Sequence, residues 1–124
     1  MKKNYFQKRF KKFEVKEKKK FVNKIPKNAL VELTNACNHA CVFCYNPEMK
    51  RPISSIDLKT FKTFIIKGVS EGLEEVGLYS TGEPFMTKNL YEYIKISKDN
   101  GIKRTYITSN GALADINKVK KLIN

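Results

Sequence analysis

The chain has 124 residues, which is enough for one modest domain with a single hydrophobic core. The formal net charge is +13, but residues 1–20 contain ten Lys or Arg and two Glu, so the other 104 residues carry only +5. No apolar run approaches the length of a membrane span, and the lysine-rich start lacks the apolar segment of a signal peptide. We therefore expect no membrane span and a cytoplasmic location, where free thiols stay reduced.

The basic charge alone is weak evidence for nucleic-acid binding. Only three of the cations are arginines, and specific readers of bases and phosphates rely on the arginine fork. We expect residues 1–27 to form a basic N-terminal arm, in which Phe6, Phe10 and Phe13 are spaced for a short amphipathic helix. Two interpretations remain open: a solvated tail, or a helix that docks on RNA, an acidic peptide or a membrane surface.

The first strand-helix unit follows Pro26. Residues 29–34 are typical of a strand, and this strand leads directly into the cysteines. After a polar connection, Ser54 and Asp57 make an S-x-x-D start signal for a helix, and Gly72 is a plausible C-terminal stop. The apolar positions that recur at helical spacing are Leu58, Phe61, Ile65 and Val69.

Two further units repeat this pattern. Residues 76–80 predict a second strand, and residues 88–99 predict a helix. The inward positions of that helix are Leu90, Tyr93, Ile94 and Ser97. Residues 102–108, rich in β-branched side chains, predict a third strand, and Asp115 can cap a last helix. The apolar face of the last helix is Ile116, Val119, Leu122 and Ile123.

The order β-α-β-α-β-α predicts an α/β fold, in which three consecutive β-α units form a parallel sheet. Crossovers between parallel strands are right-handed, so the three strand ends should open on the same edge of the sheet. These ends lead to Cys37, Glu83 and Asn110. We therefore expect three distant polar segments to converge on one site.

All three cysteines lie in one short stretch, spaced C-x3-C-x2-C at Cys37, Cys41 and Cys44. Clustered thiolates are soft ligands for zinc, copper(I) or an iron-sulfur cluster. A cubane cluster normally takes four cysteines, so three would leave one iron open to a non-protein ligand. Two alternatives remain: the cysteines are buried small hydrophobes on one helix face, or they bind structural zinc with His39 as fourth ligand.

The segments after the second and third strands have simpler interpretations when each is taken alone. Gly82-Glu83-Pro84 and Ser109-Asn110-Gly111 could each be only a turn, and Phe43 could be a packing residue. Their common position beside the cysteines favours a shared site over three unrelated turns.

With these motifs in view, the chain resembles the N-terminal part of the catalytic domain of the radical S-adenosylmethionine (radical SAM) superfamily. The cysteine spacing, with Phe43 before the third cysteine, looks like that superfamily's cluster motif. Residues 81–84 look like its Gly-Gly-Glu-Pro segment, with Thr81 in place of the first glycine, and residues 108–111 are similar to the turn after its third strand. The resemblance covers residues 28–124 and implies the first half of a partial (β/α)6 TIM-like barrel.

The resemblance also implies which residues bind the cofactors. Cys37, Cys41 and Cys44 would bind three irons of a [4Fe-4S] cluster, and S-adenosylmethionine (SAM) would chelate the fourth iron. Glu83 would accept a hydrogen bond from the SAM amino group, and Gly82 would let the backbone come close.

The remaining contacts that the resemblance implies involve the adenosine end of the cofactor and its surroundings. Phe43 would pack near the adenine, and Ser109 and Asn110 would offer polar contacts.

The implied reaction is reductive cleavage of SAM to methionine and a 5′-deoxyadenosyl radical, which abstracts hydrogen from a substrate. A flavodoxin- or ferredoxin-type reductant is implied, whereas the substrate, whether peptide, nucleic acid or small molecule, is not indicated. Since only three of six units are present, we expect a fragment of a longer enzyme, or a partner chain that completes the barrel. The alternative function is a non-catalytic zinc or iron-sulfur module with a basic arm for RNA or peptide docking.

Overall fold

The structure is a computed structural model that describes residues 25–123. Within them the regular elements are, in chain order, β1 (Asn28–Leu30), η1 (Asn46–Glu48), α2 (Leu58–Ser70), β2 (Glu75–Gly77), η2 (Pro84–Met86), α3 (Leu90–Asp99), β3 (Arg104–Tyr106) and α4 (Ile116–Ile123). The amphipathic helix predicted around Phe6, Phe10 and Phe13 lies outside the described residues. None of the helices between residues 25 and 123 is long and apolar enough to cross a membrane.

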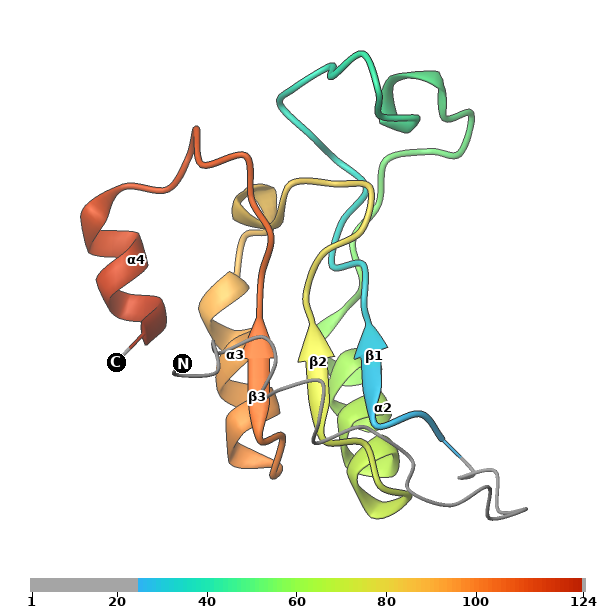
Figure 1. Cartoon of the computed structure of the whole chain (residues 1–124), viewed down its shortest axis with the longest axis vertical. Helices are drawn as coiled ribbons and strands as arrows, with labels where there is room; N and C mark the ends of the chain where they lie inside the picture. Colours follow the sequence, from blue (N-terminus) through green and yellow to red (C-terminus); the bar gives the residue numbers. More distant parts are fainter. Residues whose placement is uncertain (1–24, 124) are drawn as a thin grey trace, which may run out of the picture.

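The three strands form one parallel sheet in the order β1-β2-β3, as the sequence predicted. Ala29 pairs with Val76, and Val76 pairs with Thr105. All three strands run in the same direction, and α2 and α3 cover one face of the sheet (Figure 1). The α/β class and the parallel topology are therefore confirmed.

The strands are shorter than the predicted ranges 29–34, 76–80 and 102–108. Hydrogen bonding continues for one residue past the strands, with Val31 N–H donating to Gly77 O at 2.8 Å and Leu78 N–H to Tyr106 O at 2.8 Å. Beyond that point the three segments that follow the strands separate into different loops (Figure 1). The ladder ends early because the three segments must diverge there to form the loops above the sheet.

The hydrophobic core lies between the sheet and helices α2 and α3. Val76 of the central strand and Leu78 just after it are fully buried, as are Phe61 and Ile65 of α2. The Phe61 ring meets the Tyr93 ring edge-on with centroids 5.1 Å apart. The other buried apolar residues are Leu33, Leu73, Leu90, Ile94 and Ile102. The apolar positions predicted for the first two helices thus form the core that supports the sheet.

Helix α2 ends near the predicted stop, but its cap is Asp57, three residues after the Ser54 that begins the predicted S-x-x-D signal. Asp57 caps α2, because its Oδ1 accepts the Thr60 N–H at 2.9 Å, and Gly72 follows the helix with φ of 108°. Ser54 is not part of this cap. Its N–H instead donates to Asn35 Oδ1 at 2.7 Å.

Helix α4 is capped as predicted but its apolar face is only partly covered. Asp115 Oδ1 accepts the Asn117 and Lys118 N–H groups at 3.0 and 2.9 Å. Of the predicted apolar positions, Leu122 packs against the core, whereas Ile116 and Ile123 are exposed.

The face of the sheet opposite α2 and α3 carries a polar chain of contacts across all three strands. Asn28 Nδ2 donates to Glu75 Oε2 at 3.1 Å, and Tyr106 OH donates to Asn28 Oδ1 at 3.0 Å. Side chains alternate between the faces of a strand, so this face takes Asn28, Glu75 and Tyr106 while their neighbours enter the core. The two faces of the sheet are chemically distinct.

The end of the sheet away from the cysteines is fastened by Glu74. Its carboxylate accepts hydrogen bonds from Lys27 Nζ at 2.9 Å and Lys103 Nζ at 3.0 Å, so it links the starts of β1 and β3. The hydrogen bonds from Lys27 and Lys103 lower the pKa of Glu74 to about 2. Protonation of Glu74 would remove both contacts.

We predict that Glu74→Gln flattens the acid dependence of stability. A carboxyl whose pKa is lower in the folded than in the unfolded chain stabilises the fold above the unfolded pKa, and this contribution is lost as the pH falls toward about 2. Urea unfolding between pH 5 and about 2 should show a smaller loss of stability for the variant. The control is Glu71→Gln at an exposed position, and equal slopes for all three proteins would contradict the assignment.

Candidate functional site

The carboxyl ends of the three strands open at one edge of the sheet, and the predicted segments meet there. The loop of residues 37–53 rises above this edge, beside the turns that follow β2 and β3 (Figure 1). This is where parallel sheets with crossover helices place their chemistry. The predicted convergence of the three segments is therefore confirmed for the described residues.

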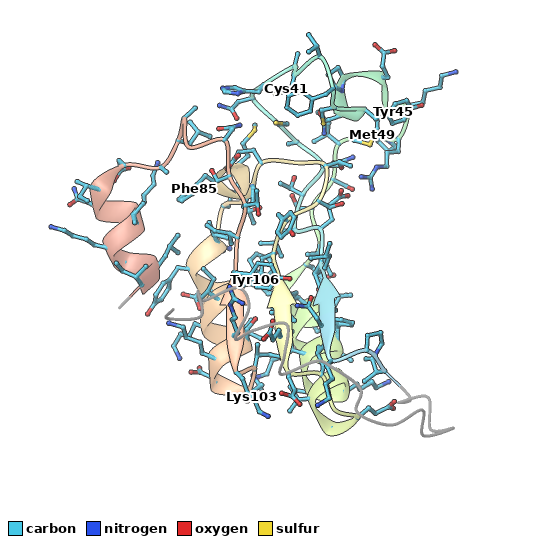
Figure 2. All side chains as sticks on the ribbon, viewed as in Figure 1. Cys41, Tyr45, Met49, Phe85, Lys103 and Tyr106 are labelled. Carbon is cyan, nitrogen blue, oxygen red and sulfur yellow. The ribbon has the colours of Figure 1, made fainter. Side chains whose placement is uncertain are left out.

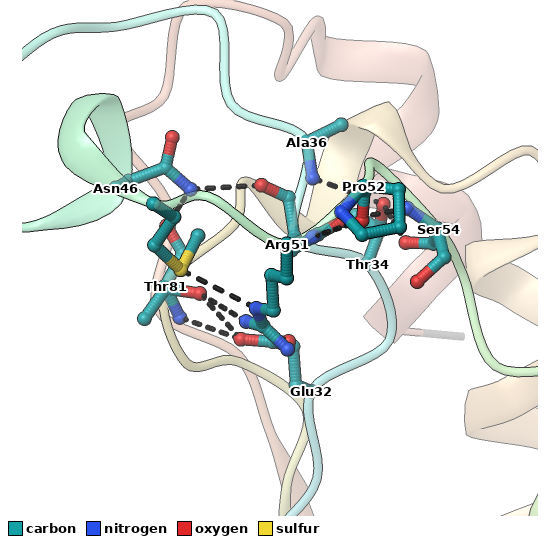
Figure 3. A network of polar contacts seen from close by, with 10 residues as sticks. Glu32, Thr34, Ala36, Asn46, Arg51, Pro52, Ser54 and Thr81 are labelled. Atoms are coloured by element: carbon teal, nitrogen blue, oxygen red, sulfur yellow. Dashed lines mark hydrogen bonds and ion pairs between the residues drawn. The ribbon is translucent and has the colours of Figure 1, made fainter.

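The cysteine loop is closed at its base by Asn35. This buried side chain accepts the Ser54 N–H at 2.7 Å and donates to Pro52 O at 2.9 Å, and its backbone N–H donates to Ser54 O at 3.2 Å. Thr34 Oγ1 donates to the same Ser54 carbonyl at 3.0 Å (Figure 3). Both ends of the loop are thus fixed to each other, although they lie about twenty residues apart in sequence.

Asn46 connects the loop to the turn after β2. Its Nδ2 donates to Asn35 O at 2.8 Å and to Thr81 O at 2.9 Å (Figure 3). Its backbone N–H approaches Cys44 Sγ at 3.4 Å. Asn46 also begins η1, a short 3-10 turn directly after the third cysteine. One asparagine therefore touches a cysteine, the loop base and the neighbouring turn.

The cysteines themselves lie in an irregular segment. Residues 37–44 form no helix, and Cys37, Cys41 and Cys44 are free thiols that are each partly exposed. Figure 2 shows Cys41 and Tyr45 on this loop, above Phe85 of η2. The alternative in which the three cysteines pack as buried hydrophobes on one helix face is wrong for this structure.

The three thiols form the donor set of this loop. Within residues 25–123, no three Cys, His, Asp or Glu side chains are gathered as the ligands of one metal ion. In a cubane cluster each cysteine binds a different iron, so the thiolates need not converge on one point. The donor set on this loop fits a cluster with one open iron.

Glu83 lies at the centre of the site and is only 3% exposed. Its Oε1 accepts hydrogen bonds from Phe85 N–H at 3.0 Å and Ser109 Oγ at 2.8 Å, and its Oε2 accepts the Asn110 N–H at 2.8 Å. A buried carboxylate is unfavourable unless such donors surround it. Glu83 therefore joins the turn after β2 to the turn after β3.

Asn110 extends this connection to the cysteines. Its Nδ2 donates to Asn38 Oδ1 at 2.9 Å and lies 4.0 Å from Cys37 Sγ. Its Oδ1 accepts the Ala112 N–H at 3.0 Å, which holds the side chain in place. The third predicted segment thus contacts the first.

Gly82 packs against the segment that follows β1 more closely than any other residue type could. A Cβ atom at this position would lie 2.0 Å from Thr34 O and 2.8 Å from Ala36 O. The adjacent Glu83 N–H donates to Ala36 O at 2.8 Å. The absence of a side chain at Gly82 is what lets the turn rest on the base of the cysteine loop.

Phe43 is the predicted site residue that the structure leaves apart from the others. Its side chain is 90% exposed, and its neighbour Val42 is fully exposed. Exposed apolar side chains on a binding loop are consistent with a surface that a ligand covers. Its predicted contact with the adenine stays a prediction.

The sequence analysis missed Glu32, Arg51 and Asn46, which belong to the same site. Arg51 Nη2 donates to Glu32 Oε1 at 2.5 Å and to Thr81 Oγ1 at 3.0 Å. A carboxylate near the end of an otherwise apolar strand was a signal that could have singled out Glu32. Asn46 and Arg51 lie in a polar connection, where no pattern distinguishes them.

Comparison with known families gives one match that covers most of the chain. A family model described as Radical SAM superfamily matches residues 31–124. Among solved structures, the crystal structure of BtrN in complex with AdoMet and 2-DOIA superposes with a TM-score of 0.75 at 24% sequence identity. That likeness covers 82% of this chain and 43% of BtrN, and it supports the fold.

Three curated proteins with different names are similar to this chain. A probable GTP 3′,8-cyclase of Sulfurisphaera tokodaii is 32% identical over 67% of this chain and 26% of its own length. A PqqA peptide cyclase of Gluconobacter oxydans is 31% identical over 78% and 27%. An Fe-coproporphyrin III synthase of Methanosarcina barkeri is 33% identical over 73% and 22%. The chain therefore spans about a quarter of the length of these relatives.

We predict that Gly82→Ala destabilises the fold by about 1–3 kcal/mol or more, because the added methyl group has only backbone to displace. The free energy of unfolding from urea titration measures the effect. Ser80→Ala, at an exposed position in the same turn, is the control and should change stability by less than about 0.5 kcal/mol. Equal stabilities of the two variants would contradict the close packing at Gly82.

Proposed function

Because the chain belongs to the radical SAM superfamily, whose members use a [4Fe-4S] cluster and SAM, we propose that it is the cluster-binding and SAM-binding part of a radical SAM enzyme. The observation that carries this proposal is the Glu83 carboxylate, which gathers the turns after β2 and β3 beside Cys37. A carboxylate, amide groups and a thiol from three strand ends meet there. This set of groups suits a cofactor whose amino and carboxylate groups also bind a metal.

Cys37, Cys41 and Cys44 would each bind one iron of the cluster. Partial exposure of the thiols leaves them accessible for assembly, and the closed base of the loop fixes the segment that carries them. With three protein ligands, one iron remains for the amino and carboxylate groups of SAM.

Glu83 can still accept a hydrogen bond from the SAM amino group. An ionised carboxylate offers about four acceptor positions. Phe85, Ser109 and Asn110 use three of them, and both oxygens of Glu83 are turned toward the turns that border the site. Gly82 brings the backbone of this turn against the loop base, because a Cβ atom there would meet the Thr34 and Ala36 carbonyl oxygens.

Ser109, Asn110 and Phe43 would complete the cofactor contacts. Ser109 Oγ is held by Glu83 and by the Gly111 N–H, which donates to it at 2.9 Å. The backbone N–H of Asn110 is held by Glu83. The exposed Phe43 ring would gain burial by packing on the adenine. These residues would position the cofactor rather than react with it.

When bound, the cluster and SAM together supply one-electron cleavage of a carbon-sulfur bond, which yields methionine and a 5′-deoxyadenosyl radical that abstracts hydrogen from the substrate. The electron would come from a flavodoxin- or ferredoxin-type carrier. The excess of lysine would attract an acidic carrier of that kind. We place the protein in the cytoplasm, because free thiols and their cluster persist in a reducing compartment.

The substrate lies beyond what this part of the chain specifies. The relatives are named for GTP, a peptide and a coproporphyrin, yet each aligns with this chain over a similar quarter of its length. The aligned part is therefore common to enzymes with different substrates. A peptide, a nucleic acid and a small molecule all remain compatible with the site, and three further strand-helix units or a partner chain would supply the rest of the pocket.

We predict that anaerobic incubation of the chain with iron and sulfide yields about four irons per chain and a visible charge-transfer absorbance. Cys37→Ala, Cys41→Ala and Cys44→Ala should each lose most of both signals, because each variant leaves one iron without its ligand. Val42→Ala, at a fully exposed position inside the same loop, is the control and should keep them.

A colourless product would contradict this proposal. Stoichiometric zinc without iron or sulfide would favour the alternative, a non-catalytic zinc module. Iron and absorbance that survive in all three cysteine variants would place the cluster elsewhere.

We further predict that the reconstituted protein, given dithionite and SAM, produces 5′-deoxyadenosine and methionine in equal amounts. Liquid chromatography with mass detection measures both products. The control is Cys41→Ala treated in the same way, which should release neither above background. Cluster formation without any 5′-deoxyadenosine would limit the chain to cluster binding.

A further inference from the structure

We propose that Glu32, Arg51 and Thr81 form a latch that holds the cysteine loop on the turn of Gly82 and Glu83, and thereby sets the position of the cluster relative to bound SAM. This inference rests on the proposed function. The three residues come from different segments: the segment just after β1, the return of the cysteine loop and the turn after β2. None of them contributes a thiol or a contact to Glu83.

Glu32 is the centre of the latch. Its side chain is 21% exposed, and its two oxygens are used by different partners. Oε1 accepts Arg51 Nη2 at 2.5 Å, and Oε2 accepts both the backbone N–H of Thr81 at 3.2 Å and its hydroxyl at 2.5 Å (Figure 3). A carboxylate with donors from two segments fixes one segment to the other.

Arg51 contacts both of the other latch residues. The same Nη2 that meets Glu32 also donates to Thr81 Oγ1 at 3.0 Å, and Nε lies 3.3 Å from Met49 Sδ within the loop. Arg51 therefore belongs to the cysteine loop on one side and contacts the turn on the other. A planar guanidinium with several donors can make both contacts at once, which a lysine ammonium does less well.

The charge state of Glu32 agrees with this role. Burial of the Glu32 carboxylate opposes its ionisation, but hydrogen bonds from Thr81 and Arg51 outweigh burial, so the pKa of Glu32 is lower than usual. The carboxylate is ionised near neutral pH, and the ion pair with Arg51 is present.

Thr81 links the latch to Glu83, the residue proposed to contact SAM. In the motif that this chain resembles, the residue is glycine, which has no hydroxyl to offer. Here the Thr81 hydroxyl donates to Glu32 and accepts from Arg51, while the Thr81 carbonyl accepts from Asn46. Thr81 is two residues from Glu83 in sequence, so movement of the latch would move the carboxylate that faces SAM.

The test compares Thr81→Val, which keeps the size of the side chain but removes the hydroxyl, with Thr81→Ser, which keeps the hydroxyl. A second pair is Arg51→Gln and the control Lys50→Gln, a neighbouring exposed lysine. Two quantities are measured on each protein. One is the hydrogen-deuterium exchange of peptides from residues 45–53 without cluster, and the other is the SAM concentration that half-saturates the change in the electron paramagnetic resonance spectrum of the reduced cluster.

We expect Thr81→Val and Arg51→Gln to speed exchange in residues 45–53 and to raise the half-saturating SAM concentration about tenfold, with iron content unchanged. Thr81→Ser and Lys50→Gln should match the parent chain in both measurements. Recovery with serine separates a hydroxyl contact from mere loss of packing.

Failures of the latch, of its positioning role and of the proposed function each give a different result. If Thr81→Val and the parent chain exchange alike, the latch is wrong whatever the cluster does. If the variants change exchange but not SAM binding, the positioning role is wrong. If the parent chain forms no cluster, the proposed function fails, and the exchange experiment still decides whether the latch holds the loop.

Discussion

The buried carboxylate of Glu83 is the constraint on which the rest of this site depends. A carboxyl group that is 3% exposed needs hydrogen-bond donors around it, and here the donors come from the turn after β3 and from η2. Its own backbone N–H donates to Ala36 O, in the segment that leads from β1 to the cysteines. One residue thus requires three strand ends to lie together. The parallel sheet brings the segments to the same edge, and Glu83 fixes their final spacing.

The site consists of a closely packed base and an exposed loop. At the base, the position of Gly82 has no room for a side chain. The Asn35 side chain makes hydrogen bonds with the backbone of Pro52 and Ser54, where the loop returns. Above it, Val42 and Phe43 extend into solvent and contribute little packing. The position of the thiols therefore follows from polar contacts at the base of the loop, not from a hydrophobic core beneath them. Such contacts are directional and fix geometry at the cost of few residues.

Much of the fold follows from periodicity and connection handedness. The apolar positions of α2 and α3 recur at helical spacing because one face of each helix must cover the sheet, and the Asp115 cap was legible as a single residue. The lengths of the strands could not be predicted, because backbone pairing between the strands ends where the loops diverge. No local sequence pattern indicates that point. Ser54 was assigned to a helix cap, whereas its partner is Asn35, 19 residues earlier. The Glu32, Thr81 and Arg51 contacts join residues up to 49 positions apart, beyond any motif.

The latch and the Glu83 contacts act on the same turn from opposite sides. Glu83 binds the turn to the segment after β3, while Thr81 binds it to the cysteine loop and to the first strand. Gly82 lies between them and rests on the backbone of Thr34 and Ala36, so the turn has almost no freedom to move alone. A shift of the loop that carries the cysteines would reach the carboxylate through Thr81 and also through Asn110, which contacts both Glu83 and Asn38. A cluster bound above and an amino acid bound beside Glu83 would be held at a spacing set by both connections.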